Sequence, residues 1–403
     1  MAYSIGSTPK ARGETMVYLD NAATSWPKPE AVYQCVDRVM RECGGNPGRS
    51  GHRQSLAAHV EIGKTRRLLA ELFHAEDPSR FIFTRNATEA VNLALKGLLF
   101  EGDHAIIGSM EHNALARPLN ALKSRGVSYT MVPVSPVSGV TAAAVQAALT
   151  PQTKLIALSH ASNVTGTVNP IEEIGRIARK HHVLFLLDAA QTAGLLPIDL
   201  KALDIDLLAC SSHKGLLGPQ GVGILYIGKN ASPLPLIEGG TGSKSEQLTQ
   251  PDALPDRYES GTPNTPGIAG LGAGIRHLLD TGIDVIAAQE RMLTQRLLDG
   301  LGALPAVTLY GSPTIENRIS IVSFNISGYD CAEVAIILDQ SFDIAVRAGL
   351  HCAPLAHASL GTLASGTVRV SVGAFNTIEH IDFFLQAVCA IAGSVSHGNG
   401  VKP

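Results

Sequence analysis

The sequence has few of the features that mark secreted, membrane-spanning or nucleic-acid-binding proteins. Its longest apolar runs, such as Val183–Leu187, are far too short to span a bilayer, and Met1–Thr15 lacks the apolar core of a secretory signal. The six cysteines form no Cys-x-x-Cys pair, which argues against a zinc finger and a disulfide scaffold. Lys and Arg number 32 against 35 Asp and Glu, so no excess of positive charge favours nucleic acid or anionic membrane. We expect a cytoplasmic protein without a metal, nucleic-acid or membrane partner.

The 403 residues are 45% hydrophobic and 17% charged, a composition that supports a large core and excludes global disorder. Short apolar runs alternate with stretches of helical period over the first two thirds of the chain, as expected for strands buried on both faces of a mostly parallel sheet. The predicted strands are 81–84, 105–107, 129–132, 155–158, 183–187, 207–209 and 222–227, and the predicted helices are 88–99, 114–124 and 171–180. This order predicts a three-layer α/β/α domain over residues 17–265.

The pattern changes after Pro266, where the sequence predicts a smaller α+β domain over residues 266–393. Two long helices are expected at 268–281 and 286–301, followed by strands at 318–325, 344–347 and 368–372 and a helix from Ile378. The first residues of the 17–265 unit are expected to pack on this small domain. The stretch 239–265 is polar and rich in Gly and Pro, and long connections of this kind are usually functional. Residues 1–16 and 394–403 are expected to be poorly ordered tails.

Two side chains at predicted strand ends carry the chemical argument. Asp188 ends the apolar run 183–187, and Lys214 follows the next run in a loop rich in Ser, His and Gly, 26 positions later. Each residue has an ordinary alternative, since Asp188 could cap a turn and Lys214 could be a loop lysine. Together they suit pyridoxal 5'-phosphate, because an acid can hold a proton on the pyridine nitrogen while a lysine holds the aldehyde.

A third element, Thr84–Ala90, lies between a predicted strand and a predicted helix. A helix N-terminus offers free backbone N–H groups and a positive dipole end, both suited to phosphate. The alternative is a simple Thr cap with Glu89 complementing the dipole.

Seven segments occur in an order that closely resembles the class V aminotransferase group of fold-type I pyridoxal-phosphate enzymes. They are Tyr18–Thr24, Ala87–Ala90, Glu111–Asn113, Ser162–Gly166, Asp188–Gln191, Ser211–Lys214 and Glu259–Asn264. Two more, Arg347–Ala353 and Thr367–Ser371, resemble its cysteine desulfurase and selenocysteine lyase branch. The resemblance covers roughly Val17–Leu385 and implies the fold-type I architecture.

The resemblance also implies a role for individual residues. Lys214 would hold the cofactor aldehyde, Asp188 would pair with the pyridinium nitrogen, and His112 would stack on the ring and help move protons. The remaining residues implied to bind the cofactor are Ala87, Thr88, Gln191, Ser211, His213 and Thr262. Thr262 would reach the phosphate of a neighbouring subunit, which implies a homodimer with shared active sites. Asn163 and Arg369 would hold the substrate carboxylate, a task that suits the planar fork of arginine.

Cys352 is the cysteine that the resemblance singles out, and the other five are expected to be structural. It follows Gly349 and His351 in a loop, where a nearby cation would favour the reactive thiolate. Whether His351 points at the sulfur is left open. The loop departs from close relatives in having Leu350 at a position that often carries a second His, and Pro354 directly after Ala353. His52 lies in a segment that resembles an active-site loop, but a surface turn explains it equally well.

The implied function is conversion of L-cysteine to L-alanine, with the sulfur kept as a persulfide on Cys352 and passed to a possible acceptor protein. Three alternatives stay open at this point. The chain could be a selenocysteine lyase or cysteine sulfinate desulfinase, or a class V aminotransferase or epimerase with an incidental Cys352. It could also be a sulfur-relay or scaffold protein without catalysis, which the presence of both Asp188 and Lys214 disfavours.

Overall fold

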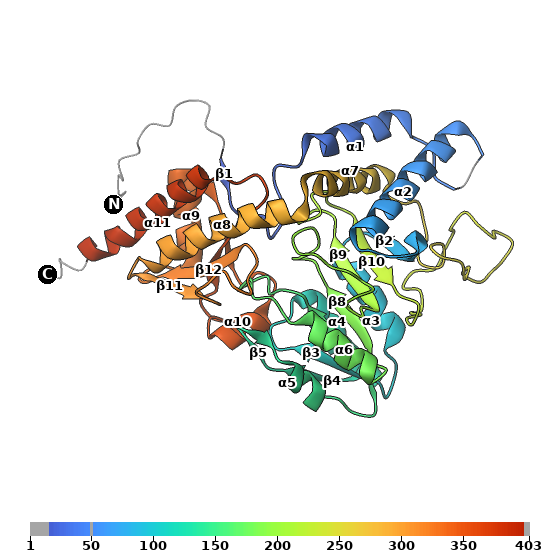
Figure 1. The fold of residues 1–403 in the computed structure, drawn as a ribbon, viewed down its shortest axis with the longest axis horizontal. Coiled ribbons are helices and arrows are strands. Elements are labelled where there is room, and N and C mark those ends of the chain that lie inside the picture. The colour runs from blue at the N-terminus through green and yellow to red at the C-terminus, as the bar shows by residue number, and fades with distance from the viewer. Residues whose placement is uncertain (1–15, 49–50, 399–403) are drawn as a thin grey trace.

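The computed structural model describes residues 16–48 and 51–398 (Figure 1). The tail expected at 1–16 lies outside these residues except for Met16, and so do residues 399–403. The tail expected to begin at 394 is not irregular at its start, because α11 (Ile378–Gly398) continues through residues 394–398.

A seven-stranded sheet forms the large domain, in the order β2-β10-β9-β8-β7-β3-β4. Its strands are β2 (Phe81–Thr84), β3 (His104–Gly108), β4 (Ser128–Val132), β7 (Thr153–Ser159), β8 (Leu184–Asp188), β9 (Leu207–Ser211) and β10 (Gly223–Ile227). All neighbouring strands from β9 to β4 pair in parallel, whereas β10 is antiparallel to both β9 and β2. The mostly parallel sheet that the sequence predicts is confirmed.

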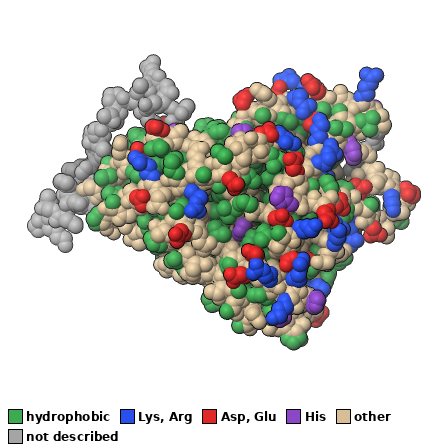
Figure 2. Space-filling model, viewed as in Figure 1, with side chains coloured by type: hydrophobic (Ala, Val, Ile, Leu, Met, Phe, Trp, Pro, Cys, Tyr) green, Lys and Arg blue, Asp and Glu red, His purple; other side chains and the backbone are tan. Residues whose placement is uncertain are grey.

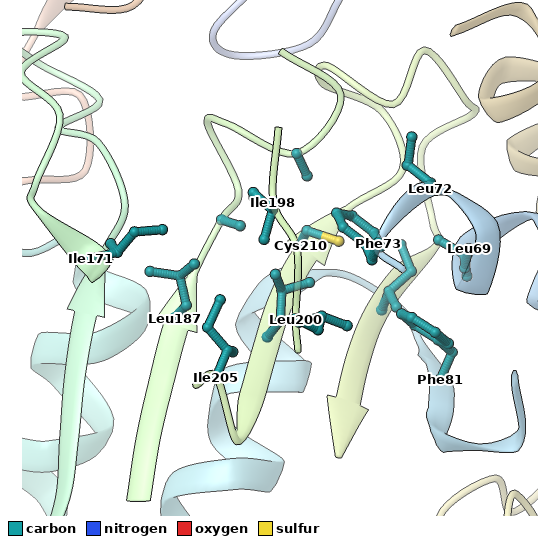
Figure 3. Close-up of a cluster of buried hydrophobic side chains, with 14 of the residues drawn as sticks. Leu69, Leu72, Phe73, Phe81, Ile171, Leu187, Ile198, Leu200, Ile205 and Cys210 are labelled. Carbon is teal, nitrogen blue, oxygen red and sulfur yellow. The ribbon is translucent and has the colours of Figure 1, made fainter. Parts of the chain in front are cut away.

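Both faces of this sheet are buried, because alternate strand residues enter two different cores. In β7, Leu155 and Ala157 pack in one core and Ile156 and Leu158 in the other. The first core contains helices α3 (Ala87–Leu98) and α4 (Asn113–Leu122). The second contains α2 (Arg53–Leu72), α5 (Ala142–Ala147) and α6 (Ile171–Lys180), and Figure 3 shows Leu69 and Leu72 of α2 among its side chains. Helices on both faces complete the three predicted layers.

Helix α7 (Thr265–Thr281) packs with the large domain, although the sequence analysis placed its residues in the small one. Ile268, Leu271 and Ile275 of α7 belong to the same core as α2 and the sheet. Figure 1 shows α7 beside α2 and under α1 (Glu30–Glu42). The apolar period of 268–281 predicts a helix correctly, but a period does not indicate which sheet the helix covers.

The small domain is a four-stranded antiparallel sheet in the order β11-β12-β15-β14, with helices packed on it. Its elements are β11 (Val307–Tyr310), β12 (Ile321–Ile326), β14 (Arg347–Gly349), β15 (Thr367–Ser371), α8 (Ile283–Gly302), α9 (Cys331–Phe342) and α11. Helix α10 (Pro354–Leu360) packs instead against Met110 and Val164 of the large domain. The chain's beginning joins the small domain, since β1 (Val17–Tyr18) pairs in parallel with β13 (Ile344–Ala345). Minor elements are β5 (Val134–Ser135), β6 (Gly139–Val140) and the 3₁₀ turns Pro78–Arg80 and Lys123–Arg125.

Acidic and basic side chains are interspersed on the face that Figure 2 shows. Within residues 16–48 and 51–398, none of the helices combines the length and apolar character needed to cross a membrane. The same residues contain no group of three or more His, Cys, Asp and Glu side chains placed to hold a metal ion. All six cysteines are free thiols.

Candidate active site

A cavity of about 220 Å³ lies where the parallel strands of the large sheet end. Asp188 is the last residue of β8, Ser211 is the last of β9, and Thr88 lies in the first turn of the helix that follows β2. Ligands of open α/β sheets bind at this edge. The predicted site residues that line the cavity are Ala87, Thr88, His112, Asn163, Asp188, Gln191, Ser211, His213 and Lys214.

Lys214 and Asp188 lie close enough in this cavity to influence each other's ionisation. Burial lowers the pKa of Lys214 from its usual value to about 8, against the opposing effect of the Asp188 charge. Burial raises the pKa of Asp188, while a hydrogen bond from the Ala190 backbone N–H (2.9 Å) and the charge of Lys214 act the other way. A lysine with this pKa has a neutral, nucleophilic fraction near pH 7, which an ordinary surface lysine lacks.

His112 is neutral and its ring is fixed at the start of α4. Its Nδ1 accepts the backbone N–H of Ala114 at 3.0 Å, so its proton is on Nε2. Burial, together with the charges of Lys214 and nearby arginines, lowers the pKa of His112 to about 4. The ring is therefore available as a neutral surface on the cavity wall.

The other end of the cavity has the donors that a phosphate needs. Asn86 caps α3 by accepting the Glu89 N–H at 2.9 Å, which leaves the first-turn N–H groups of Ala87 and Thr88 at a positive dipole end. His213 Nδ1 is buried and has no hydrogen-bond partner in the described part of the chain. An unpartnered buried nitrogen beside a helix N-terminus fits an anionic group, so these residues suit the phosphate of the predicted cofactor.

The sequence analysis missed a cluster of donors that holds the peptide between His213 and Lys214. The carbonyl oxygen of His213 accepts hydrogen bonds from the Ser25 N–H (2.9 Å) and the Lys28 ammonium (2.8 Å). Ser25 Oγ also donates to the Lys214 carbonyl at 2.9 Å. These contacts join segments about 190 positions apart, which local sequence patterns do not reveal.

Glu111 is a second buried carboxyl near Asp188, and the sequence analysis gave it no role although it quoted the residue. It accepts hydrogen bonds from the Ser159 N–H (3.0 Å) and the Ser159 hydroxyl (2.5 Å). Burial raises the pKa of Glu111 to about 8, and the Asp188 charge adds to this effect. Ser159 ends β7 directly beside Asp188 and lines the cavity.

Arg369 and Asn163, the two residues predicted to hold the substrate carboxylate, are in direct contact. Arg369 is only 1% exposed on β15, and its Nη1 donates to the Asn163 carbonyl at 3.0 Å. Its Nη2 donates to the Asp20 carboxylate at 2.8 Å, and its buried Nε has no partner among the described residues. Asn163 Nδ2 donates to the carbonyl of His351 at 2.7 Å, which connects the carboxylate site to the Cys352 loop.

Cys352 is exposed and lies in a loop with left-handed backbone at Gly349, His351 and Cys352 (φ +104°, +49° and +58°). His351 is not the neighbouring cation. Its Nε2 lies 3.0 Å from Thr367 Oγ1, and burial lowers its pKa to about 2, so the ring is neutral. Arg347 takes this place instead, with Nη2 3.5 Å from Cys352 Sγ. The Asn113 N–H donates to the Cys352 carbonyl at 2.9 Å, directly after His112 of the cavity lining, and Cys352 is among the groups that influence the pKa of Lys214.

Thr262 and His52 lie away from the cavity lining. Thr262 is exposed on the long connection and accepts a hydrogen bond from Asn46 Nδ2 at 3.2 Å. His52 caps α2, where its Nδ1 accepts the Ser55 N–H at 3.3 Å. A capping role accounts for His52 without catalysis.

Comparisons with known proteins agree with this geometry. A profile of the family described as aminotransferase class-V matches residues 17–384. A probable cysteine desulfurase of Pyrococcus abyssi is 35% identical over 92% of this chain and 93% of its own length. A cysteine desulfurase of Salmonella agona is 34% identical over 95% of each chain. The apo structure of a cysteine desulfurase from Thermococcus onnurineus superimposes with a TM-score of 0.88 and 32% identity, covering 94% of this chain and 95% of that one.

Proposed function

The chain belongs to the class-V aminotransferase family, and we propose that it is a cysteine desulfurase that converts L-cysteine to L-alanine and keeps the sulfur as a persulfide on Cys352. The observation that carries this proposal is the joint placement of Lys214, Asp188 and Cys352. A partly neutral amine and a buried carboxylate share one cavity, and an exposed thiol lies within electrostatic reach of that amine.

Pyridoxal 5'-phosphate is the proposed cofactor, and it would supply an electron-withdrawing ring that stabilises negative charge on the substrate's α carbon. Lys214 would hold its aldehyde, Asp188 its ring nitrogen and Gln191 its phenolic oxygen. The first turn of α3, with Ala87 and Thr88, would hold the phosphate together with Ser211 and His213. The buried, unpartnered Nδ1 of His213 and the pKa of Lys214 near 8 support this assignment.

The substrate would be oriented by its carboxylate. Arg369 has N–H groups left over after its bonds to Asn163 and Asp20, and the second N–H of the Asn163 amide is available beside them. The amine of Lys214, once free of the cofactor, would remove the α proton and return a proton later. The neutral His112 ring would cover the cofactor face and carry its proton on Nε2.

The sulfur step would use Cys352. Its thiolate attacks the substrate sulfur, so an S–S bond forms and the substrate's C–S bond breaks. The electron pair of the broken bond stays with the carbon skeleton, which takes up protons and leaves as alanine. Arg347 Nη2, 3.5 Å from Cys352 Sγ, would place a positive charge beside the attacking sulfur. The persulfide is left in an exposed loop, from which a sulfur-acceptor protein could take it.

Side-by-side assays test this function. Purified protein supplied with pyridoxal phosphate is incubated with L-cysteine, L-selenocysteine and L-cysteine sulfinate in the presence of a reductant, and alanine is measured. We expect alanine and sulfide from cysteine, with a persulfide on Cys352 before reduction. Alanine from selenocysteine or sulfinate alone would contradict the proposal in favour of a lyase or desulfinase.

We also propose a homodimer in which Thr262 binds the cofactor phosphate of the partner. Thr262 is exposed and lies outside the cavity lining of its own chain. Apolar side chains are exposed on α1, on α2 and in the segment between β10 and α7 that carries Thr262. They are Tyr33, Met40, Leu56, Val60, Leu236, Ile237 and Leu248. An isologous two-fold contact would cover them.

Subunit mixing tests shared sites more sharply than size alone. We expect Lys214→Ala and Thr262→Val proteins each to be weakly active or inactive when assayed alone. If the sites are shared, a mixed dimer contains one site with both native residues, and mixing restores activity. No restoration in subunits shown to exchange, or a fully active monomer in sedimentation velocity, would contradict the proposal.

A further inference from the structure

We infer that Asp20 is a built-in counter-ion of Arg369 that weakens, and thereby sets, the affinity of the site for the substrate carboxylate. The inference rests on the proposed function, which assigns Arg369 to that carboxylate. Asp20 follows β1 and lies in a parallel bridge with Ser371, so its backbone is fixed beside β15. Its Oδ1 accepts a hydrogen bond from Arg369 Nη2 at 2.8 Å, although the two residues are 349 positions apart.

The burial of the two partners shows why this carboxylate matters. The side chain of Arg369 is 1% exposed, whereas that of Asp20 is 20% exposed. A buried guanidinium needs an anion, because an uncompensated charge away from water is strongly unfavourable. In the absence of substrate, Asp20 supplies that anion, and the Asn163 carbonyl supplies the other hydrogen bond.

Arg369 keeps enough donors for a second carboxylate. Of its five N–H groups, one on Nη1 and one on Nη2 are engaged, and the buried Nε has no partner in the described part of the chain. Other groups that interact electrostatically with Arg369 include Arg347, Cys352 and Lys214. A substrate carboxylate must therefore share the guanidinium with Asp20 or displace it. Removing the Asp20 charge while keeping its shape should strengthen carboxylate binding in either case.

The test compares L-alanine with L-alaninamide, two ligands that share an amine and side chain but differ in the carboxylate. Each is titrated into cofactor-loaded protein, and binding is followed by the change in visible absorbance. The affinity ratio of alanine to alaninamide cancels differences in cofactor loading between variants. For Asp20→Asn we expect this ratio to rise by about tenfold or more, since one like charge within a few Å of the ligand is removed.

Three variants separate charge from structure. Asp20→Asn keeps the acceptor oxygen, and Asp20→Glu keeps the charge, so the Glu variant should retain the wild-type ratio. Asp37→Asn is the matched control, because Asp37 forms an exposed ion pair with Arg41 on α1, and it should leave the ratio unchanged. The cofactor-free Asp20→Asn protein should also unfold at a lower temperature, because Arg369 loses its anion.

An unchanged or lower ratio in Asp20→Asn overturns the inference, since an orienting role alone predicts weaker binding. If Asp20→Asn does not fold, Asp20→Glu becomes the test. This variant keeps the charge, so a raised affinity ratio in it would overturn the inference. Protein that shows the raised ratio but makes no alanine from cysteine keeps the inference and loses the desulfurase function. If the protein makes alanine from cysteine but Asp20→Asn leaves the affinity ratio unchanged, the proposed function stands and the inference about Asp20 fails.

Discussion

Asp188 ends a strand that is hydrogen-bonded on both sides, whereas Cys352 lies in an exposed loop with left-handed backbone on two successive residues. Asp188 belongs to the candidate cofactor cavity, where burial shifts the pKa values of Lys214, His112 and Asp188. The Cys352 loop is held by a few hydrogen bonds, such as that from the Asn113 N–H to the Cys352 carbonyl (2.9 Å).

The difference between these two regions follows from their tasks. In the proposed function, the cavity keeps charges in place during proton transfer, which a paired and buried sheet edge does well. In the same proposal, the Cys352 sulfur approaches a substrate and then an acceptor, which requires exposure. Mutations in the cavity should therefore affect every substrate, and mutations in the loop should affect only those that need a thiol.

The largest effect is expected for Lys214→Ala. The variant loses the amine that we propose holds the cofactor aldehyde and moves the α proton, so turnover of all three substrates should fall on the order of a thousandfold or more. Borohydride reduction followed by peptide mapping should label Lys214 in the wild type. Label on another lysine, such as Lys28 with its lowered pKa of about 8, would refute the assignment.

Cys352→Ala should separate the two regions. The protein should bind the cofactor normally and bind cysteine with a spectral change, but alanine formation from cysteine should fall about a hundredfold or more. Selenocysteine should still react, because selenium leaves the carbon more readily than sulfur. Intact-mass measurement should find no persulfide. Cys389→Ala is the control, since this exposed thiol is far along α11, and normal cysteine turnover in Cys352→Ala would disprove the mechanism.

Arg347→Met should change the reactivity of the loop cysteine, and it also removes a charge that lowers the pKa values of Lys214 and His112 in the cavity. Without the cation 3.5 Å from the sulfur, alkylation of Cys352 by iodoacetamide at a fixed neutral pH should slow by about tenfold. Cys389 provides an internal reference in the same sample, and Arg347→Lys should recover part of the rate. Equal slowing of both cysteines would show that the reagent or the fold, rather than Arg347, is responsible.

Glu111→Gln should give the smallest effect, at a buried carboxyl that bonds to Ser159 of the cavity lining. The pKa of Glu111 is raised to about 8 in the folded protein, so its stabilising contribution is complete below its unfolded value of 4.5 and is lost as pH rises through about 8. Between about pH 5 and pH 8, the wild-type unfolding free energy should therefore fall by on the order of 1–3 kcal/mol relative to the variant. Denaturant titrations of cofactor-free protein measure this, and parallel pH profiles would contradict the raised pKa.

The sequence predicts the cavity better than the loop, and the reason is physical. Buried strands are read from local apolar runs, and Asp188 and Lys214 follow such runs directly. The run 222–227 predicts a strand correctly, but its antiparallel direction is not visible because an apolar run reads the same both ways. Helices α1, α2 and α9 were not predicted, although they follow ordinary helical periods.

The contacts that the sequence could not indicate are those between distant segments. Arg347 was quoted as part of a motif, but only the left-handed turn at 349–352 brings it to Cys352 and turns His351 inward. Asp20 meets Arg369 through the pairing of β1 with the small domain. Thr262 stays a prediction, because its proposed ligand belongs to another chain.

The joining of the chain's beginning to its end also has a consequence for synthesis. Asn21 Nδ2 donates to the Ser371 carbonyl, 350 positions later, and β1 pairs with β13, so these contacts of β1 form only after most of the polypeptide has emerged. At translation rates of about 5–20 residues per second, that delay is roughly 20–70 seconds. A chain that ends before residue 352 carries Lys214 and Asp188 but lacks Cys352 and Arg369, the two residues that the proposed function assigns to the sulfur and to the substrate carboxylate. In the proposed function, sulfur transfer would therefore wait until the small domain has been made.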